Sequence, residues 1–248
     1  MKKVLKEQPK NKVADARFYD SLILEKESEG CDLLFSDLDL TLQFLEQIKE
    51  IFKDKEVLEI GCGVGHLASV LKKKFKIKNI IATDISAECI KRAKKLYPNI
   101  DFEVMKGEDL RFEKKSFGLV ISIETLEHIA NYRRHLKEVK RVLKPGGYYI
   151  VETPNKPFNL LWETLRGNRG KVKFWHPSLF TPKSLTKEMN KLNFVVKFYK
   201  QRNFTPKSEK KLKKVFGPFG SLIAKLFPFR FLPIGFSPTL FLKAEKSE

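Results

Sequence analysis

The sequence predicts an α/β protein built on a doubly wound, mostly parallel sheet of seven strands, with helices on both faces. Short apolar runs alternate with amphipathic segments of helical length between residues 57 and 153, which is typical of βαβ units. A glycine-rich turn follows the first apolar run directly, at the edge where an open parallel sheet binds its ligands. The length of 248 residues accommodates one large domain of this kind.

Predicted helices and strands follow one another regularly up to residue 153. Over residues 18–56 apolar side chains recur three or four positions apart, which predicts helix. Ser86 is the expected N-cap of the helix over 86–97. Gly146 or Gly147 is expected to end the helix over 131–143. Strands are predicted at 57–61, 79–84, 100–107, 116–123 and 148–153, and helices between them at 66–75, 86–97 and 131–143.

The regular alternation stops after residue 153. Residues 154–180 have a mixed composition and predict loop, and a helix beginning at Thr181 and Pro182 is expected over 180–192. The last two strands are predicted at 193–201 and 239–245. We therefore expect four segments, which are an N-terminal helical segment (1–54), a core domain (55–201), an insertion (202–238) and the last strand with a tail (239–248).

The charge of the chain is strongly positive. Lys and Arg number 49 against 30 Asp and Glu, which gives a formal net charge of +19, while 42% of the residues are hydrophobic, as in an ordinary globular protein. Lys outnumbers Arg by 39 to 10. Since nucleic-acid readers favour Arg for bidentate contacts, the excess of Lys fits an RNA partner less well than a generally lysine-rich surface.

Cysteine usage and hydropathy bear on the cellular compartment. Cys31, Cys62 and Cys89 have no C-x-x-C spacing and cannot all pair, which argues against a disulfide scaffold and a cysteine-based zinc site. The basic N-terminus is followed by no apolar run of signal-peptide length, and no long stretch is free of charge and proline. These features predict a cytoplasmic protein. Peripheral contact with a membrane is compatible with them.

The glycine-rich turn GCGVG has the local context of a nucleotide-binding loop, because it follows a strand and opens a helix. Gly61, Gly63 and Gly65 allow the backbone to approach a ligand closely. The third glycine of a dinucleotide fingerprint would fall at residue 66, which is His66. Glu59 stands two residues before the first glycine, and its carboxylate suits an ammonium group better than a pyrophosphate.

Asp84 ends the second predicted strand, 21 residues after Gly63. A carboxylate in this place can accept hydrogen bonds from the two hydroxyls of a ribose. Asp84 can also act as an acid at the N-terminus of the helix that begins behind Ser86, and the two roles are compatible.

Five motifs resemble, in order, those of the class I S-adenosylmethionine-dependent methyltransferases. They are VLEIGCGVG, ATDIS, GEDLRF, ISIETLEHI and VLKPGGYYIVETPN, and the match covers residues 55–155. The resemblance implies a Rossmann-like fold and transfer of a methyl group from S-adenosylmethionine. Within this class the sequence resembles the ubiquinone-biosynthesis O-methyltransferases and the methyltransferase type 11 group. The small-RNA 3′-terminal 2′-O-methyltransferases share the pattern of residues 124–128 and are the other subgroup that it resembles.

The resemblance also implies which residues bind the methyl donor. The glycines would line its methionine part with Glu59 toward the amino group, while Asp84 would hold the ribose and Ile85 would pack on the adenine. Gly118 and Lys106 depart from the family pattern, in which acids are usual at these positions. The residues implied to bind the methyl donor are Glu59, Gly61, Gly63, Gly65, Asp84, Ile85, Glu108, Asp109, Leu110 and Glu124, in order from its methionine part to its adenine and the mouth of the site.

Glu124, Glu127 and His128 form an E-x-x-E-H motif after the fourth predicted strand. On a helical turn the three side chains would share one face, where two carboxylates and an imidazole can hold a divalent cation such as Mg²⁺. Alternatively, no metal binds and His128 helps to close the pocket. We expect His128, with Glu127, to act as the base for the acceptor or to position it. His176 is either a further metal ligand or a loop residue that caps the pocket.

The insertion at 202–238 is basic and rich in Phe. Residues 210–244 contain no acid, and 202–248 hold eight of the 21 phenylalanines. This composition predicts a lid over an apolar substrate or an element that contacts an anionic membrane surface. Plain core packing, an oligomer contact and an RNA-stacking groove are the alternatives.

The predicted reaction is methyl transfer to a hydroxyl oxygen of a small, apolar or lipid-linked acceptor. Metal-assisted 2′-O-methylation of RNA is the alternative, favoured by the charge of +19.

Overall fold

The computed structural model describes residues 14–28, 38–200, 205, 209–210, 213, 217–220, 222 and 233–247. The strands in this part of the chain are β1 (Val57–Ile60), β2 (Ile80–Asp84), β3 (Asp101–Val104), β4 (Phe117–Ile123), β5 (Leu143–Pro154), β6 (Phe194–Tyr199) and β7 (Thr239–Lys246). The helices are α1 (Ala16–Ser28), α2 (Leu38–Glu46), α3 (His66–Lys74), α4 (Ala87–Leu96), α5 (Tyr132–Val142), α6 (Lys156–Leu165), α7 (Val172–Trp175) and α8 (Pro182–Asn190). Short 3₁₀ helices are η1 (Lys49–Phe52), η2 (Leu126–His128), η3 (Arg169–Lys171) and η4 (Ile234–Phe236).

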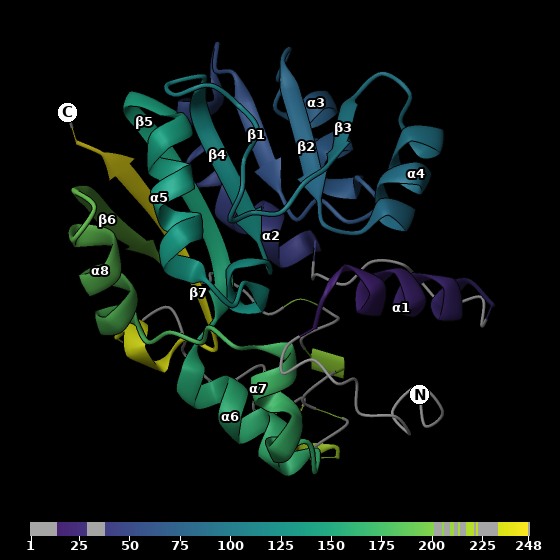
Figure 1. The fold of residues 1–248 in the computed structure, drawn as a ribbon. Helices are drawn as coiled ribbons and strands as arrows, with labels where there is room; N and C mark the ends of the chain where they lie inside the picture. Colours follow the sequence, from purple (N-terminus) through teal and green to yellow (C-terminus); the bar gives the residue numbers. More distant parts are fainter. Residues whose placement is uncertain are drawn as a thin grey trace.

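The described strands form one seven-stranded sheet in the order β3-β2-β1-β4-β5-β7-β6 (Figure 1). The first five strands in this order pair in parallel, and β7 is antiparallel to both β5 and β6. The direction of the winding reverses between β1 and β4, so the loops after these two strands diverge and open a crevice at the carboxyl end of the sheet. The predicted mostly parallel, seven-stranded α/β fold is confirmed.

Helices cover both faces of the sheet, as predicted. Successive residues of β1 show the two layers, because Val57 packs with α2, α3 and α4 whereas Leu58 packs with α5 and α8. A parallel strand that is buried on both faces must be apolar at consecutive positions. The continuous apolar runs of the sequence are therefore a consequence of this layering.

Three helices lie at the end of the sheet where the parallel strands finish, namely α1, α6 and α7 (Figure 1). Ile23 of α1 is buried against Val64 and Cys89. Asp20 of the same helix accepts hydrogen bonds from the Ser86 hydroxyl and the Glu88 backbone N–H. α1 is thus docked on the glycine-rich turn and on the beginning of α4, next to the crevice.

The predicted helix over 18–56 is wrong in its extent. The structure has α1, α2 and η1 there, residues 29–37 lie outside the described part, and Asp54 has a φ of +52° that no helix accommodates. The predicted loop at 154–180 is also wrong, since it contains α6, η3 and α7. Sequence periodicity missed α6 because its apolar side chains are divided between exposed and half-buried positions and form no single buried face.

The predicted end of the helix at 131–143 is wrong as well. α5 ends at Val142 and Leu143 is already extended. Gly146 does adopt the left-handed conformation, with φ of +65°, but it lies inside β5, where the pairing with β4 shifts register. By contrast, the predicted N-cap at Ser86 is confirmed by its hydrogen bond from the Cys89 backbone N–H. The predicted start of a helix at Thr181 and Pro182 is confirmed as well, and Thr181 caps it by accepting from the Ser184 backbone N–H.

Most of the predicted insertion at 202–238 lies outside the described residues, and the division of the chain into four segments stays a prediction. In the part of the chain that the structure describes, no helix is both long and apolar enough to cross a membrane.

Gly65 is required by packing as well as by its backbone conformation. Its φ is +84°, and a Cβ would lie 2.6 Å from Cζ of Phe102. We expect Gly65→Ala to lower the free energy of unfolding by about 2–5 kcal/mol, because the new side chain both strains the left-handed backbone and displaces the Phe102 ring. Gly167 is the matched control, because its φ is +72° but a Cβ there would meet nothing within 4 Å. Gly167→Ala should therefore lose only about 1–2 kcal/mol in urea unfolding, and equal losses in the two variants would contradict the packing argument.

Candidate active site

Glu59 is a buried acid at the carboxyl end of β1. Its side chain is 3% exposed, and among the described residues its Oε2 atom has no hydrogen-bond partner. Burial, with a smaller contribution from the charge of Asp84, raises the pKa of Glu59 to about 8. An unpaired carboxyl oxygen in such a place is unfavourable unless a ligand group pairs with it.

The Asp84 carboxylate is held against the glycine-rich turn. Its Oδ2 accepts a hydrogen bond of 2.8 Å from the Gly63 N–H, and its Oδ1 accepts one of 2.9 Å from the Ser86 N–H. Burial nevertheless raises the pKa of Asp84, although these backbone hydrogen bonds oppose the shift. The turn borders open space at Gly63, because a Cβ added to this residue would have no atom within 4 Å.

Gly61 and Gly65 serve the packing of the protein itself. A Cβ at Gly61 would lie 2.2 Å from the Thr125 hydroxyl oxygen, and one at Gly65 would collide with Phe102. Gly63 alone of the three would have open space around an added Cβ, and the binding of the cofactor by all three glycines stays a prediction.

The predicted adenine segment is anchored by α5. The Leu110 N–H donates to Glu138 Oε2 at 3.0 Å, while Asp109 is exposed and pairs with Arg134 at 3.3 Å. His135 Nδ1 lies 2.8 Å from the Gly107 carbonyl oxygen. Since a carbonyl only accepts, this nitrogen donates and fixes the start of the segment.

Two more of the predicted cofactor residues flank this region. Ile85 follows Asp84 directly and is half-buried, as is Glu108. The Met105 N–H donates to the Asp84 carbonyl oxygen at 2.9 Å. This bond ties the loop that leads to the adenine segment to the end of β2.

The E-x-x-E-H motif does not form the predicted helical face. Only its last residues lie in the 3₁₀ helix η2, and Glu124 precedes it with a φ of +49°. Glu127 is fully buried, and its Oε2 accepts a hydrogen bond of 2.8 Å from the Thr153 hydroxyl. Burial raises the pKa of Glu127 to about 7.

The structure does not support the predicted Mg²⁺ site at Glu124, Glu127 and His128. Within the described ranges, no group of three or more His, Cys, Asp or Glu side chains is arranged to hold a metal ion. One Glu127 oxygen is used by Thr153, and His128 Nδ1 is used by a backbone carbonyl. The positive φ of Glu124 takes this residue out of the helical turn on which the prediction rested.

His128 is held in one tautomer. Its Nδ1 lies 2.7 Å from the carbonyl oxygen of Trp175, which can only accept, so Nδ1 carries the proton. Burial lowers the pKa of His128 below its ordinary value. The ring is therefore neutral at pH 7, with a basic lone pair on Nε2, which lies 3.8 Å from Glu127 Oε1.

His176 lies beside His128, with 5.0 Å between the ring centroids. Its Nδ1 is 3.2 Å from Oδ1 of Asn159, and burial lowers the pKa of His176 to about 4. This arrangement fits a residue that lines the pocket rather than one that binds a metal.

Sequence reasoning missed Tyr19, which α1 brings to the same place. Its ring centroid lies 5.9 Å from that of His128, and in the described part of the protein its buried hydroxyl has no hydrogen-bond partner. Burial raises the pKa of Tyr19 well above its usual range, and the charges of Glu127 and Asp84 raise it further. Tyr19 therefore lies near both His128 and Asp84. Only its place in an amphipathic N-terminal helix could have drawn attention to it.

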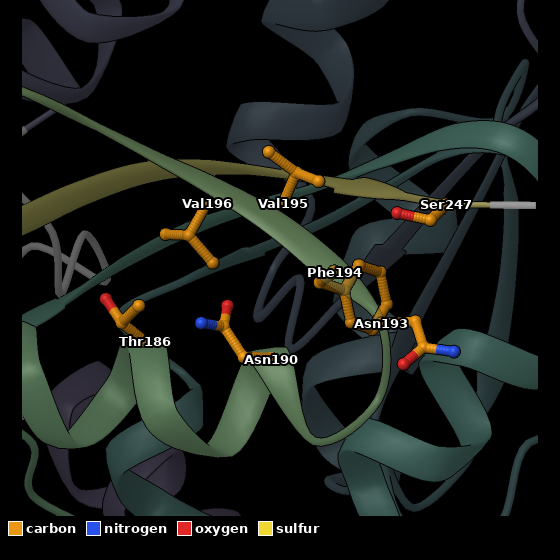
Figure 2. A pocket seen from close by; sticks show the side chains of 7 residues that line it. All are labelled: Thr186, Asn190, Asn193, Phe194, Val195, Val196 and Ser247. Atoms are coloured by element: carbon orange, nitrogen blue, oxygen red, sulfur yellow. The ribbon is translucent and has the colours of Figure 1, made fainter.

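A hollow lies along the edge strand β6 and the end of α8, and none of the predicted site residues lines it (Figure 2). Its volume is about 540 Å³, and it is lined by Thr186, Asn190, Asn193, Phe194, Val195, Val196 and Ser247. None of these side chains titrates near neutral pH, so this groove offers no acid or base for catalysis.

Comparison with known proteins identifies the family. A family model described as "Methyltransferase domain" matches residues 34–197, which is more than half of the chain. The chain belongs to this methyltransferase family.

A curated relative is the phthiotriol/phenolphthiotriol dimycocerosates methyltransferase of Mycobacterium tuberculosis. It is 38% identical over 97 residues, which are 38% of this chain and 36% of the relative. The match thus spans little more than a third of that protein's length.

Two solved structures share the fold. Phosphoethanolamine N-methyltransferase 2 of Haemonchus contortus, in complex with S-adenosylhomocysteine, superposes with a TM-score of 0.63 at 17% identity, over 94% of this chain and 58% of that chain. The [4+2]-cyclase SpnF superposes with a TM-score of 0.62 at 16% identity, over 95% and 97% of the two chains. Since a cyclase and a methyltransferase share the fold, the reaction has to be argued from the site.

The residues at the crevice fit S-adenosylmethionine. The unpaired Glu59 oxygen can accept from its ammonium group, the open space at Gly63 leaves room for its chain, and Asp84 can accept from its ribose. Three buried acids with raised pKa values also favour a positively charged ligand over an anionic one.

The binding of S-adenosylmethionine should depend on pH through Glu59. Between pH 6 and 7.5 this carboxyl is protonated in the free protein, because its pKa is about 8. Pairing with an ammonium group requires its ionisation, so affinity should rise up to about tenfold per pH unit, with release of a proton. Titration calorimetry in buffers of different ionisation enthalpy measures both effects. In Glu59→Gln the affinity should be lower and constant over this range, and an unchanged slope would exclude Glu59 as the partner.

Proposed function

We propose that the protein transfers a methyl group from S-adenosylmethionine to a hydroxyl oxygen of a small, apolar or lipid-linked acceptor. The observation that carries this proposal is the state of His128. Its Nδ1 proton is committed to the Trp175 carbonyl and its ring is neutral, so Nε2 is available as a base.

The donor half of the site consists of Glu59, the turn at Gly63, Asp84, Ile85 and the segment 108–110. When bound, S-adenosylmethionine supplies a methyl group on a positively charged sulfur, which keeps the electron pair of the broken carbon–sulfur bond. The protein mainly has to align the acceptor with that methyl group and to exclude water. In this proposal Glu59 holds the amino end of the donor and Asp84 holds the ribose.

His128 removes the acceptor proton. As the acceptor oxygen attacks, its proton moves to Nε2 and the electron pair of its O–H bond stays on oxygen while the new oxygen–carbon bond forms. The imidazolium that results lies 3.8 Å from Glu127 Oε1. Because the pKa of Glu127 is about 7, this carboxyl can lose its proton and stabilise the imidazolium.

Aromatic side chains around His128 favour an apolar acceptor. Tyr19 packs edge-on against His128, and Phe18 packs against Phe174 with 5.2 Å between the ring centroids. A lipid acceptor is also consistent with the name of the mycobacterial relative, a dimycocerosates methyltransferase. The RNA alternative rests on the charge of +19 and on a metal-assisted step, for which Glu124, Glu127 and His128 are not arranged.

The chemical class of the acceptor can be tested directly. Purified protein is incubated with methyl-labelled S-adenosylmethionine and a total cell extract, with Mg²⁺ or with EDTA, and the products are separated into lipid, RNA and aqueous fractions. We expect label in the lipid fraction, unaffected by EDTA because no metal takes part. Label in RNA that disappears with EDTA would overturn the proposal.

Replacing the base should slow catalysis without weakening binding of the methyl donor. For His128→Gln we expect kcat to fall about 10²- to 10⁴-fold, which is the usual contribution of a general base. Its Kd for S-adenosylmethionine should stay within about twofold of the wild type, since His128 contacts the acceptor. Asp84→Ala is the complementary variant, in which the Kd should rise while the fold persists. Wild-type turnover in His128→Gln would exclude His128 as the base.

A further inference from the structure

Three apolar residues of α6 face outward, whereas Phe158, Leu160 and Trp162 are half-buried. Of its ten residues, all of them described, only Glu163 is buried. Leu161 and Leu165 are 57% and 53% exposed, and with the exposed Pro157 they form a stripe at i, i+4 and i+8 along the helix. A helix that packed on the core of a soluble domain would show the opposite distribution.

The stripe is surrounded by positive charge. The segment 156–175 contains a single acid, Glu163, which is buried and accepts hydrogen bonds from Arg166 at 3.3 Å and Asn168 at 3.0 Å. Its basic residues are Lys156, Arg166, Arg169, Lys171 and Lys173. The solvent-facing part of this segment therefore combines apolar and basic side chains without an exposed acid.

This segment is also connected to the candidate active site. The Trp175 carbonyl oxygen accepts the hydrogen bond from His128, and Asn159 of α6 contacts His176. Phe174 packs against Phe18 of α1, whose helix lies with α6 and α7 at the carboxyl end of the sheet (Figure 1). The segment that carries the exposed stripe therefore also supplies contacts to His128 and His176 from its other face.

We propose that α6 and the segment up to Trp175 dock on the surface of an anionic lipid bilayer. Exposed leucines at helical spacing can enter the headgroup region, while Lys and Arg beside them pair with anionic headgroups. An RNA partner would use the basic residues but would leave the leucine stripe unexplained. This element is distinct from the membrane contact predicted at 202–238. The docking on a bilayer does not depend on the proposed function. Delivery of a lipid-linked acceptor from the bilayer to His128 rests on it.

The experiment is sedimentation of the full-length protein with vesicles of phosphatidylcholine, with and without phosphatidylglycerol. We expect binding to the anionic vesicles that weakens with added salt. In Leu161→Glu/Leu165→Glu the partition coefficient should fall by about tenfold or more, because two apolar side chains no longer enter the interface. Leu96→Glu on α4 is the matched control, since Leu96 is 51% exposed on a different helix, and its binding should be unchanged. Lys171→Glu/Lys173→Glu should reduce binding to anionic vesicles only.

Intrinsic fluorescence provides a second readout at the proposed site. Both tryptophans of the chain, Trp162 and Trp175, lie in this segment. Their emission should shift to the blue on vesicle binding and be quenched by brominated lipids, and neither change should occur in the double leucine variant.

Three outcomes would overturn the docking proposal. They are no binding of the wild type to anionic vesicles, equal binding by the double leucine variant, and binding of RNA that depends on the lysines but not on the leucines. Calorimetry with S-adenosylmethionine on the same variants separates this result from the proposed function. Vesicle binding without label in the lipid fraction would refute the proposed acceptor and leave the docking intact.

Discussion

The donor half of the site depends on one carboxylate. Asp84 accepts hydrogen bonds from the backbone N–H groups of Gly63 and Ser86, which fixes the turn after β1 to the end of β2. Ser86 is the N-cap of α4, and its hydroxyl bonds to Asp20, so α1 is docked on the same junction. The glycine-rich turn, the proposed ribose-binding position and the N-terminal helix are thereby held together by side chains around the end of β2.

The acceptor half is built from parts that are far apart in sequence. α1 contributes Tyr19, η2 contributes His128, and α7 contributes the carbonyl oxygen of Trp175 that fixes the imidazole. Such contacts involve backbone carbonyls and ring edges, for which no local pattern exists. Because each contact joins residues separated by many positions, the geometry of this half emerges only from the packing of the helices at the carboxyl end of the sheet.

This difference explains what the sequence could predict. The order of strands and helices in the core and the grouping of Glu59, Gly63 and Asp84 follow from local periodicity and from the rule that ligands bind where parallel strands end. Other predictions failed where tertiary packing overrides local preference. Glu124 has a positive φ that breaks the expected helical face, Gly146 is used inside β5 instead of at a helix end, and α6 is apolar on its exposed side.

The candidate site is acidic, whereas the chain as a whole is basic. The chain carries a net charge of +19, yet the crevice gathers the buried acids Glu59, Asp84 and Glu127. Burial raises the pKa values of all three, and the charge of Asp84 adds to the shift at Glu59, so in the free protein ionisation of these carboxyls is unfavourable. A ligand with an ammonium and a sulfonium group would stabilise the ionised carboxylates, whereas an anion would destabilise them further. In the two proposals taken together, the buried acids favour the cationic methyl donor, whereas the basic segment 156–175 favours an anionic surface. His128 is joined to that segment through the Trp175 carbonyl oxygen.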